Sequence, residues 1–203
     1  MKEKKHYIVV GITGGIGSGK TTISNYFKTL GIPVYHADDE AKALMNRSKI
    51  IRRKLIGLFG EEAYKNDRLN RDYLRGKIFK DKMLLQQMNN IVHPKVKSHF
   101  ERWAKKQNAS YILKEVAIIF ENNLQDQYNY IISVVADEKE RIHRVVKRDN
   151  TSEASVKAII ANQLSDSEKI KKSDFVIYNN NIGIAKAQAI SIHNQLLIKL
   201  REV

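Results

Sequence analysis

A glycine-rich segment near the N-terminus constrains this chain more than any other part of its sequence. Residues 14–21 read GGIGSGKT and satisfy the pattern G-x-x-x-x-G-K-[S/T]. They follow an apolar, β-branched segment, Tyr7–Ile12, and precede a helical pattern over residues 19–30. In this order of strand, loop and helix, the pattern binds phosphate through converging backbone N–H groups. The sequence therefore predicts a nucleotide-binding α/β chain.

The residues of this loop have distinct expected roles. Glycines let the backbone wrap closely around a phosphate, because they tolerate positive φ and carry no Cβ. We expect Lys20 to reach the β- and γ-phosphates, the Thr21 hydroxyl to bind Mg²⁺ and Thr22 to support the loop. The expected nucleotide-binding residues of the loop are Gly14, Gly15, Ile16, Gly17, Ser18, Gly19, Lys20, Thr21 and Thr22.

Short apolar segments along the chain predict the strands of one parallel sheet. Each is followed by a helical pattern, an alternation typical of a doubly wound α/β fold with, here, a five-stranded sheet. The segments are Tyr7–Ile12, Ile32–Tyr35, Tyr111–Ile119, Tyr130–Ala136 and Phe175–Tyr178. Residues 38–106 instead show charged, helix-periodic segments with breaks near 57–60, 66–70 and 93–94, and we expect a helical insertion there.

Charge and cysteine content narrow the class of protein. The chain has 36 Lys+Arg against 22 Asp+Glu, a net charge of +14, which favours a polyanionic partner. Residues 42–106 alone hold 18 Lys+Arg and 6 Asp+Glu. Cysteine is absent, which excludes a disulfide-stapled fold, a thiolate zinc site and a cysteine nucleophile. With no long apolar run or signal-peptide pattern, we expect a cytoplasmic protein without a membrane partner.

An aspartate follows the second predicted strand, at the edge where ligands bind in open α/β sheets. Asp38 could accept the proton of an attacking hydroxyl, or it could cap the next helix, and its position alone leaves both interpretations open. The GTPase strings D-x-x-G and N-K-x-D do not occur, nor does the signature of transporter ATPases. Small-molecule kinases and basic nucleic-acid NTPases remain.

The loop and several later strings together resemble the dephospho-CoA kinase family. The matching strings occur in order at residues 11–22, 30–38, 69–74, 78–79, 91–94, 118–121, 144–149, 163, 173–177 and 179–180. The resemblance implies ATP-dependent phosphorylation of the ribose 3′-hydroxyl of dephospho-coenzyme A, the last step of coenzyme A synthesis. It also implies a P-loop kinase core at 1–41, 107–140 and 166–203, a dephospho-CoA-binding helical insertion at 42–106 and a lid at 141–165.

On the acceptor side, the resemblance makes Asp38 the catalytic base and gives Arg71 and His93 substrate-binding roles. An exposed helix arginine is the alternative for Arg71, and a helix break the alternative for the His93-Pro94 pair. The family's first Asp of its D-A-D string is His36 here, so no role follows for that position. We interpret His36 as a polar residue at the end of a strand.

On the ATP side, the resemblance assigns Arg144 and Arg148 to the lid, with Arg148 acting in catalysis together with Lys20. Helical spacing places these two arginines and Arg141 on one face, which is also what a solvated helix face would show. Asn179 is expected on the adenine side, unless it only forms a turn. Glu115 falls where such kinases keep an acid directed at Mg²⁺.

The expected cosubstrate and cofactor are thus ATP and Mg²⁺, and the expected partner is dephospho-coenzyme A. We expect neither a nucleic acid nor a membrane as a partner, and a monomer rather than an oligomer. A kinase for another small acceptor, such as a nucleoside or nucleotide, is the next hypothesis. A basic P-loop protein that binds nucleic acid is the third, although regular aromatic interleaving is absent from the helical segments.

Overall fold

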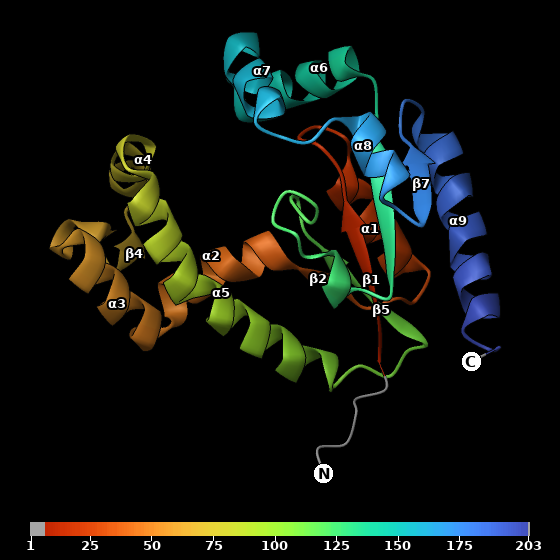
Figure 1. Ribbon diagram of the computed structural model, residues 1–203, viewed down its shortest axis with the longest axis horizontal. Coiled ribbons are helices and arrows are strands. Elements are labelled where there is room, and N and C mark those ends of the chain that lie inside the picture. The colour runs from red at the N-terminus through yellow and green to blue at the C-terminus, as the bar shows by residue number, and fades with distance from the viewer. Residues whose placement is uncertain (1–6, 203) are drawn as a thin grey trace. The chain divides into compact units, whose positions relative to one another are not determined.

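The computed structural model describes residues 7–202, apart from the side chains of Lys80 and Lys82. The chain divides into two compact units (Figure 1). One comprises the residues up to His36 together with those from Gln107 onward, and the other is Ala37–Lys106. We call them the core unit and the helical unit and describe each by itself.

Within the described residues, the core unit contains one sheet of five parallel strands. Its order is β2-β5-β1-β6-β7. The strands are β1 (Ile8–Thr13), β2 (Val34–His36), β5 (Tyr111–Glu115), β6 (Tyr130–Val135) and β7 (Phe175–Tyr178). The α/β class and the five parallel strands expected from the sequence are confirmed.

The predicted strand Tyr111–Ile119 is too long at its carboxyl end. β5 ends at Glu115, and the chain then turns out of the sheet, with Val116 N–H still donating to Ile12 O at 3.0 Å. Ile119 and Phe120 are buried although they lie in turns. The last part of the apolar run is therefore buried without being a strand. Periodicity cannot distinguish these two cases for short runs.

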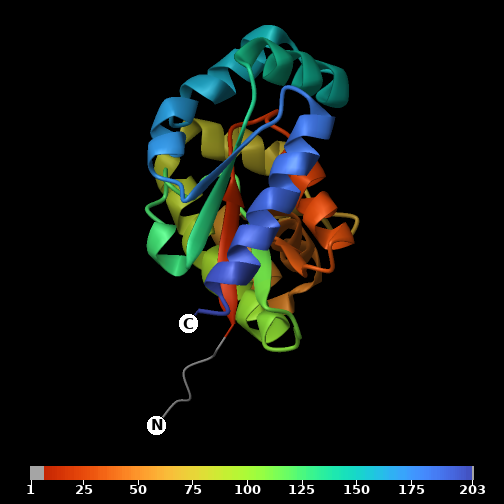
Figure 2. The ribbon, with the colours of Figure 1, turned by 90° about the vertical axis from the view of Figure 1, so that its right-hand side faces the viewer.

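Helices α1 (Lys20–Thr29) and α9 (Ile182–Lys199) share a hydrophobic core with the sheet. Ile23 and Phe27 of α1 are fully buried, as is Ala189 of α9, against Val10 and Ile12 of β1. Figure 2 shows α9 lying along the sheet. Continuous β-branched runs suit these strands, since strands that lack a solvated face need no polar alternation.

Past the carboxyl ends of the strands lie α6 (Glu138–Asp149) and α7 (Glu153–Ala161), followed by the short helix α8 (Asp166–Lys171) (Figure 1). Ile142, Val145 and Val156 form a separate apolar cluster against which Ile16 of the glycine-rich loop packs. The tip of the loop is thus part of the hydrophobic contact between these helices.

The helical unit contains α2 (Ala37–Arg47), α3 (Lys49–Phe59), the 3₁₀ turn η1 (Glu61–Ala63), α4 (Arg71–Lys80) and α5 (Lys82–Ala104) around its own apolar cluster. It also contains a ribbon that the helical prediction missed, β3 (Tyr64–Lys65) antiparallel to β4 (Arg68–Leu69). Asn66 and Asp67 join the two strands at φ 50° and 60°. Two successive positive φ values are typical of the tight hairpin turns that match strand twist.

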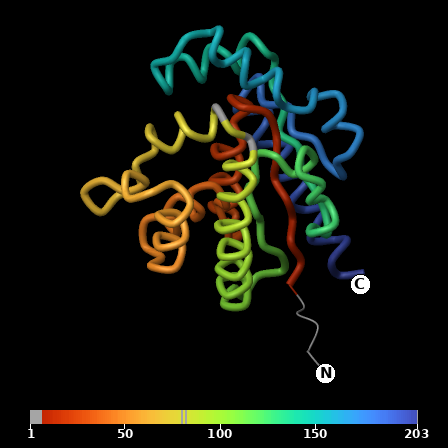
Figure 3. Tube along the Cα trace, turned by 60° about the vertical axis from the view of Figure 1, so that its left-hand side comes forward, coloured from red at the N-terminus to blue at the C-terminus, as the bar shows by residue number. Residues whose placement is uncertain are grey.

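The predicted helix break at His93-Pro94 is wrong, because α5 continues through Pro94 (Figure 3). Proline has no N–H, so the carbonyl of Asn90 loses its helical partner. Asn90, His93 and Pro94 are all exposed, which lets water solvate that carbonyl. Across the described residues, no helix combines the length and apolar character needed to cross a bilayer.

Candidate active site

The loop between β1 and α1 has the conformation that its glycines allow. Gly19 precedes Lys20, the first residue of α1, and has φ 90°. A Cβ on Gly19 would lie 2.1 Å from Asn179 Nδ2, and one on Gly15 would lie 2.1 Å from Arg141 Nη2. No side chain can replace either hydrogen without displacing these groups. Because α1 begins directly after Gly19, the loop lies at the positive end of the α1 dipole, where anions bind.

The ammonium group of Lys20 is held over this loop. Lys20 Nζ donates to the carbonyl oxygens of Gly14 at 2.7 Å and Gly15 at 3.2 Å. Its positive charge consequently lies among the loop residues that are expected to enclose the phosphates. A mobile surface lysine would lack such an anchor.

A partly buried carboxylate lies beside the first turn of α1. Glu115 Oε1 accepts a hydrogen bond from Thr21 Oγ1 at 2.7 Å, and Oε2 accepts one from Ser24 Oγ at 3.0 Å. His36 Nδ1 also contacts Oε2. Burial raises the pKa of Glu115, but the hydrogen bonds from His36, Thr21 and Ser24 outweigh it, and the net pKa lies below its usual value. This carboxyl is therefore ionised at neutral pH.

The strand order explains why these residues meet. β5 lies between β1 and β2, and its register places Glu115 beside His36 and beside Ile12. Glu115 and His36 are the last residues of their strands. Sequence reasoning did not connect Glu115, His36 and Ser24, since that required knowing which strands are neighbours.

The acid and the hydroxyl together have the chemistry of a Mg²⁺ site. The Thr21 hydroxyl gives its one proton to Glu115, so its lone pairs stay available to a cation. Mg²⁺ prefers oxygen ligands and in kinases takes most of them from phosphates and water. The described residues contain no group of three or more His, Cys, Asp or Glu suited to hold a metal.

One residue of α6 and one of the segment before α8 hold the tip of the loop on both sides. Gln163 Oε1 accepts from Ile16 N–H at 2.9 Å, and Arg141 Nε donates to Ile16 O at 2.9 Å. Arg141 Nη1 also pairs with Asp166 Oδ2 at 2.9 Å, and Arg141 is only 5% exposed. Arg141 is thus a buried support of the loop rather than part of a solvated helix face.

The other two arginines of α6 differ from each other. Arg144 Nη2 donates to Asn179 O at 2.9 Å, and Asn179 Nδ2 donates to Ser18 O at 2.8 Å. The buried Asn179 therefore links Arg144 to the backbone of the phosphate loop. Arg148 is exposed and makes two hydrogen bonds of 2.7 Å to Asp149, which raise the pKa of the guanidinium.

In the helical unit, Asp38 lies in the first turn of α2, and it is exposed. Because α2 begins at Ala37, directly after β2, Asp38 is inside the helix and does not occupy its N-cap position. The capping interpretation is therefore wrong. A carboxylate in a first turn still interacts favourably with the helix dipole.

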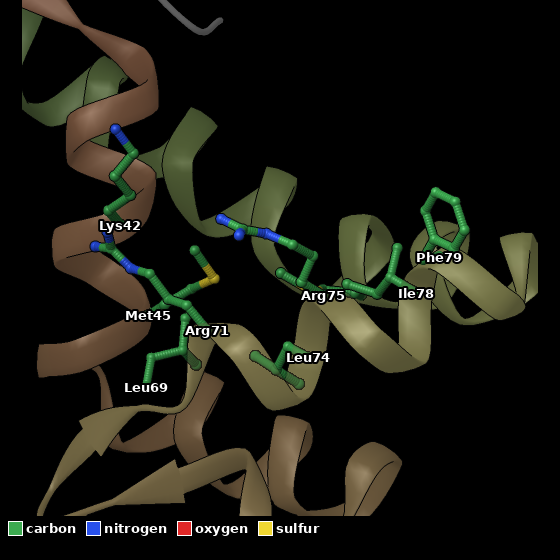
Figure 4. A pocket seen from close by; sticks show the side chains of 9 residues that line it. Lys42, Met45, Leu69, Arg71, Leu74, Arg75, Ile78 and Phe79 are labelled. Atoms are coloured by element: carbon green, nitrogen blue, oxygen red, sulfur yellow. The ribbon is translucent and has the colours of Figure 1, made fainter. Parts of the chain in front are cut away.

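The same unit has a pocket of about 440 Å³ between α2, β4, α4 and α5. Figure 4 shows Arg71 and Arg75 of α4 extending toward Lys42 of α2, so the cationic ends gather on one side. The remaining lining residues are apolar: Met45, Leu69, Leu74, Ile78, Phe79 and Met88. His93 is exposed on α5 and is not a lining residue of this pocket.

Comparisons with known proteins identify one family. The model of the dephospho-CoA kinase family matches residues 8–184. A dephospho-CoA kinase of Porphyromonas gingivalis is 38% identical over 186 residues, which cover 91% of this chain and 92% of that protein. One from Bacteroides fragilis is 38% identical over 174 residues, 85% of each chain. A crystal structure from Thermus thermophilus has a TM-score of 0.86 and 29% identity, covering 94% of this chain and 98% of that one. The phosphate loop, the α/β core and these matches show that the chain belongs to the dephospho-CoA kinase family of P-loop kinases.

Proposed function

We propose that this enzyme transfers the γ-phosphoryl group of ATP to the ribose 3′-hydroxyl of dephospho-coenzyme A, the last step of coenzyme A synthesis. The observation that carries the proposal is a complete phosphate loop, with Lys20 and Thr21 both held by hydrogen bonds, in a chain of this family. Positioning and electrostatic stabilisation supply most of the catalysis in such transfers.

The core unit would bind ATP. The N–H groups of the loop and the start of α1 would receive the β- and γ-phosphates, and Lys20 would neutralise part of their charge. Arg144 and Asn179 would contribute from the far side of the loop, because both already contact its surroundings. Thr22, exposed beside Thr21, would help to close the phosphate site.

Thr21 would hold Mg²⁺ directly, and Glu115 would orient the Thr21 hydroxyl. When bound, the ion neutralises phosphate charge and aligns the phosphates for in-line transfer. ATP is a cytoplasmic cosubstrate, and we expect the enzyme in that compartment.

Asp38 would act on the acceptor hydroxyl. In α/β sheets the edge past the carboxyl ends of the strands carries the ligands, and Asp38 follows β2 by one intervening residue. Its carboxylate would orient the ribose 3′-hydroxyl and accept its proton as the phosphoryl group arrives.

The pocket of the helical unit would bind the rest of the acceptor. Dephospho-coenzyme A combines a diphosphate with a long, largely uncharged arm, and the pocket combines Lys42, Arg71 and Arg75 with an apolar lining. The planar guanidinium of Arg71 can make paired hydrogen bonds to a phosphate. His93 would contact the acceptor from α5, outside this pocket.

Residues 141–165 would form a lid over the nucleotide. Within this segment Arg148 is exposed and its guanidinium bonds to the neighbouring Asp149, so it can exchange that carboxylate for a phosphate oxygen. Lid closure would bring its charge to the transferring phosphoryl group and exclude water.

A panel of acceptors tests the proposal. With ATP and Mg²⁺, we expect ADP release only when dephospho-coenzyme A is added, and no comparable release with nucleosides or nucleoside monophosphates. Lys20→Ala serves as the inactive control. Faster turnover of a nucleoside monophosphate would replace the proposed acceptor, and tight, salt-sensitive binding of an oligonucleotide would revive the nucleic-acid hypothesis. Size exclusion of the same sample tests the expected monomer.

A further inference from the structure

We propose that His36 is a positioning residue for phosphoryl transfer, which keeps the Glu115 carboxylate turned toward the Thr21 hydroxyl. No role followed for His36 from the sequence, because the family has an aspartate there. The inference rests on the proposed Mg²⁺ site and concerns how this particular chain builds it.

The two carboxylate oxygens of Glu115 have separate partners. His36 Nδ1 and Ser24 Oγ both contact Oε2, whereas Thr21 Oγ1 contacts Oε1. Holding one oxygen fixes the rotation of the carboxylate, and this leaves the other oxygen facing Thr21. His36 and Ser24 together maintain that orientation.

The direction of the hydrogen bond at Thr21 matters for the cation. A hydroxyl has one proton and two lone pairs, so it can present lone pairs to Mg²⁺ only when its proton points elsewhere. Glu115 Oε1 takes that proton at 2.7 Å. If Glu115 rotated away, the Thr21 hydroxyl could turn its proton toward the cation, which would weaken the ligand.

The side chain of His36 is placed for this task. It is 25% exposed, against 12% for Glu115. It ends β2 directly beside the end of β5, so the backbone register brings the two side chains together. An aspartate, the family's residue at this position, would bring no such hydrogen-bond donor to Glu115.

Substitutions of similar size separate the effect of a hydrogen-bond donor from the effect of side-chain volume. Asparagine places an amide N–H near the position of His36 Nδ1, and leucine has nearly the same size without a donor. We therefore compare His36→Asn with His36→Leu, and add His36→Ala, which removes the side chain beyond Cβ. Thermal unfolding verifies that each variant is folded, and the alanine form keeps the comparison valid should the leucine variant fail to fold.

The primary readout is nucleotide binding without acceptor or turnover. Binding of a fluorescent ATP analogue is titrated with Mg²⁺ and in EDTA. In His36→Leu and His36→Ala, we expect the gain in affinity produced by Mg²⁺ to fall about tenfold, the scale of one hydrogen bond to a charged group, while affinity in EDTA stays near wild type. His36→Asn should keep most of the gain, and kcat with dephospho-coenzyme A should follow the same order.

A double substitution tests whether His36 acts through Glu115. In a Glu115→Gln background, His36→Leu should cause little further loss, because the two changes remove one arrangement. Equal loss of affinity with and without Mg²⁺, or no advantage of asparagine over leucine, overturns the proposal. A wild-type protein whose ATP affinity ignored Mg²⁺ would overturn the metal site itself and His36 with it, whereas a wrong acceptor would leave these binding data unchanged.

Discussion

At the scale of single residues, the division between binding and chemistry can be tested at Asp38. Asp38→Asn keeps the shape of the side chain and removes its ability to take a proton. We expect single-turnover transfer to slow by roughly 10²–10⁴-fold, with ATP affinity unchanged. Rapid-quench measurement of phosphorylated product gives the rate.

The neighbouring aspartate is the matched control for this change. Asp39 is exposed in the same helical turn and pairs with Lys42 at 3.0 Å. Asp39→Asn should leave the transfer rate near wild type. Equal rates for the two variants would remove the assignment of Asp38 as the base.

Local sequence could identify some site residues and not others. The phosphate loop is contiguous, so its pattern predicted both its conformation and the place of Lys20 and Thr21. Glu115 and His36 are 79 residues apart and meet only because β5 lies next to β2. A solvated helix face was one of the two interpretations open for Arg141, because its partners, Ile16 and Asp166, are also distant in the chain. Such contacts depend on strand order and loop path, which residue patterns do not encode.

At the scale of elements, the junction between α6, α8 and the phosphate loop depends on Arg141. Arg141→Ala leaves Ile16 O and Asp166 without this partner in a largely buried place. We expect the free energy of unfolding to fall by about 3 kcal/mol, as when one side of a buried ion pair is removed. Urea unfolding measures it.

The exposed pair about two turns further along α6 provides the comparison. Arg148→Ala breaks a pair whose side chains are 64% and 43% exposed, and such pairs contribute at most about 1 kcal/mol. The same urea experiment should therefore show little change for this variant. Similar losses for the two substitutions would contradict the buried role of Arg141.

The contact between β5 and α9 should make stability depend on pH. Tyr111 OH lies 2.8 Å from His193 Nδ1, and burial lowers the pKa of His193 and raises that of Tyr111. In the unfolded chain this histidine has a pKa of about 6.5, and in the folded protein its pKa is lower. As pH falls from about 6.5, the unfolded chain therefore takes up a proton more readily than the folded protein, and stability falls. We expect His193→Gln to reduce the drop in Tm between pH 7 and pH 5.

Two other titratable groups also affect the dependence of stability on pH. Burial also lowers the pKa of His99, which adds to the same trend and will remain in the variant. The lowered pKa of Glu115 acts in more acid solution, because its contribution is lost as pH falls through the folded-state value below the ordinary 4.5. An unchanged slope between pH 7 and pH 5 would show that His193 does not titrate in the way its burial indicates.

Elements formed by local patterns were predicted well, and those that depend on solvent or turn chemistry were not. All the strands of the main sheet coincide with apolar runs of the sequence. The helix through Pro94 was missed because the cost of a lost hydrogen bond is small where water can replace it. The β3–β4 ribbon is only two residues long on each side, too short for an alternating pattern.

At the scale of the whole molecule, the two units should respond separately to substitution. Arg71→Ala removes a cation from the pocket of the helical unit. We expect KM for dephospho-coenzyme A to rise by about tenfold or more and KM for ATP to stay the same, because the acceptor alone loses a charged contact. Steady-state kinetics with each substrate varied in turn measures both.

An arginine elsewhere in the same unit tests whether general charge explains the effect. Arg53 of α3 is exposed and does not line the pocket. Arg53→Ala changes net charge equally, and we expect both KM values to stay near wild type. A rise in the acceptor KM for Arg53→Ala as large as that for Arg71→Ala would favour long-range attraction over a specific contact.

The double attachment of Ile16 has a consequence for amide hydrogen exchange. Its N–H is bonded to Gln163, and its side chain packs with α6 and α7. That proton exchanges with solvent only when its hydrogen bond to Gln163 opens, so its protection factor reports how often the tip of the loop and the segment after α7 separate. If residues 141–165 form the proposed lid, this one backbone amide measures how often the lid opens.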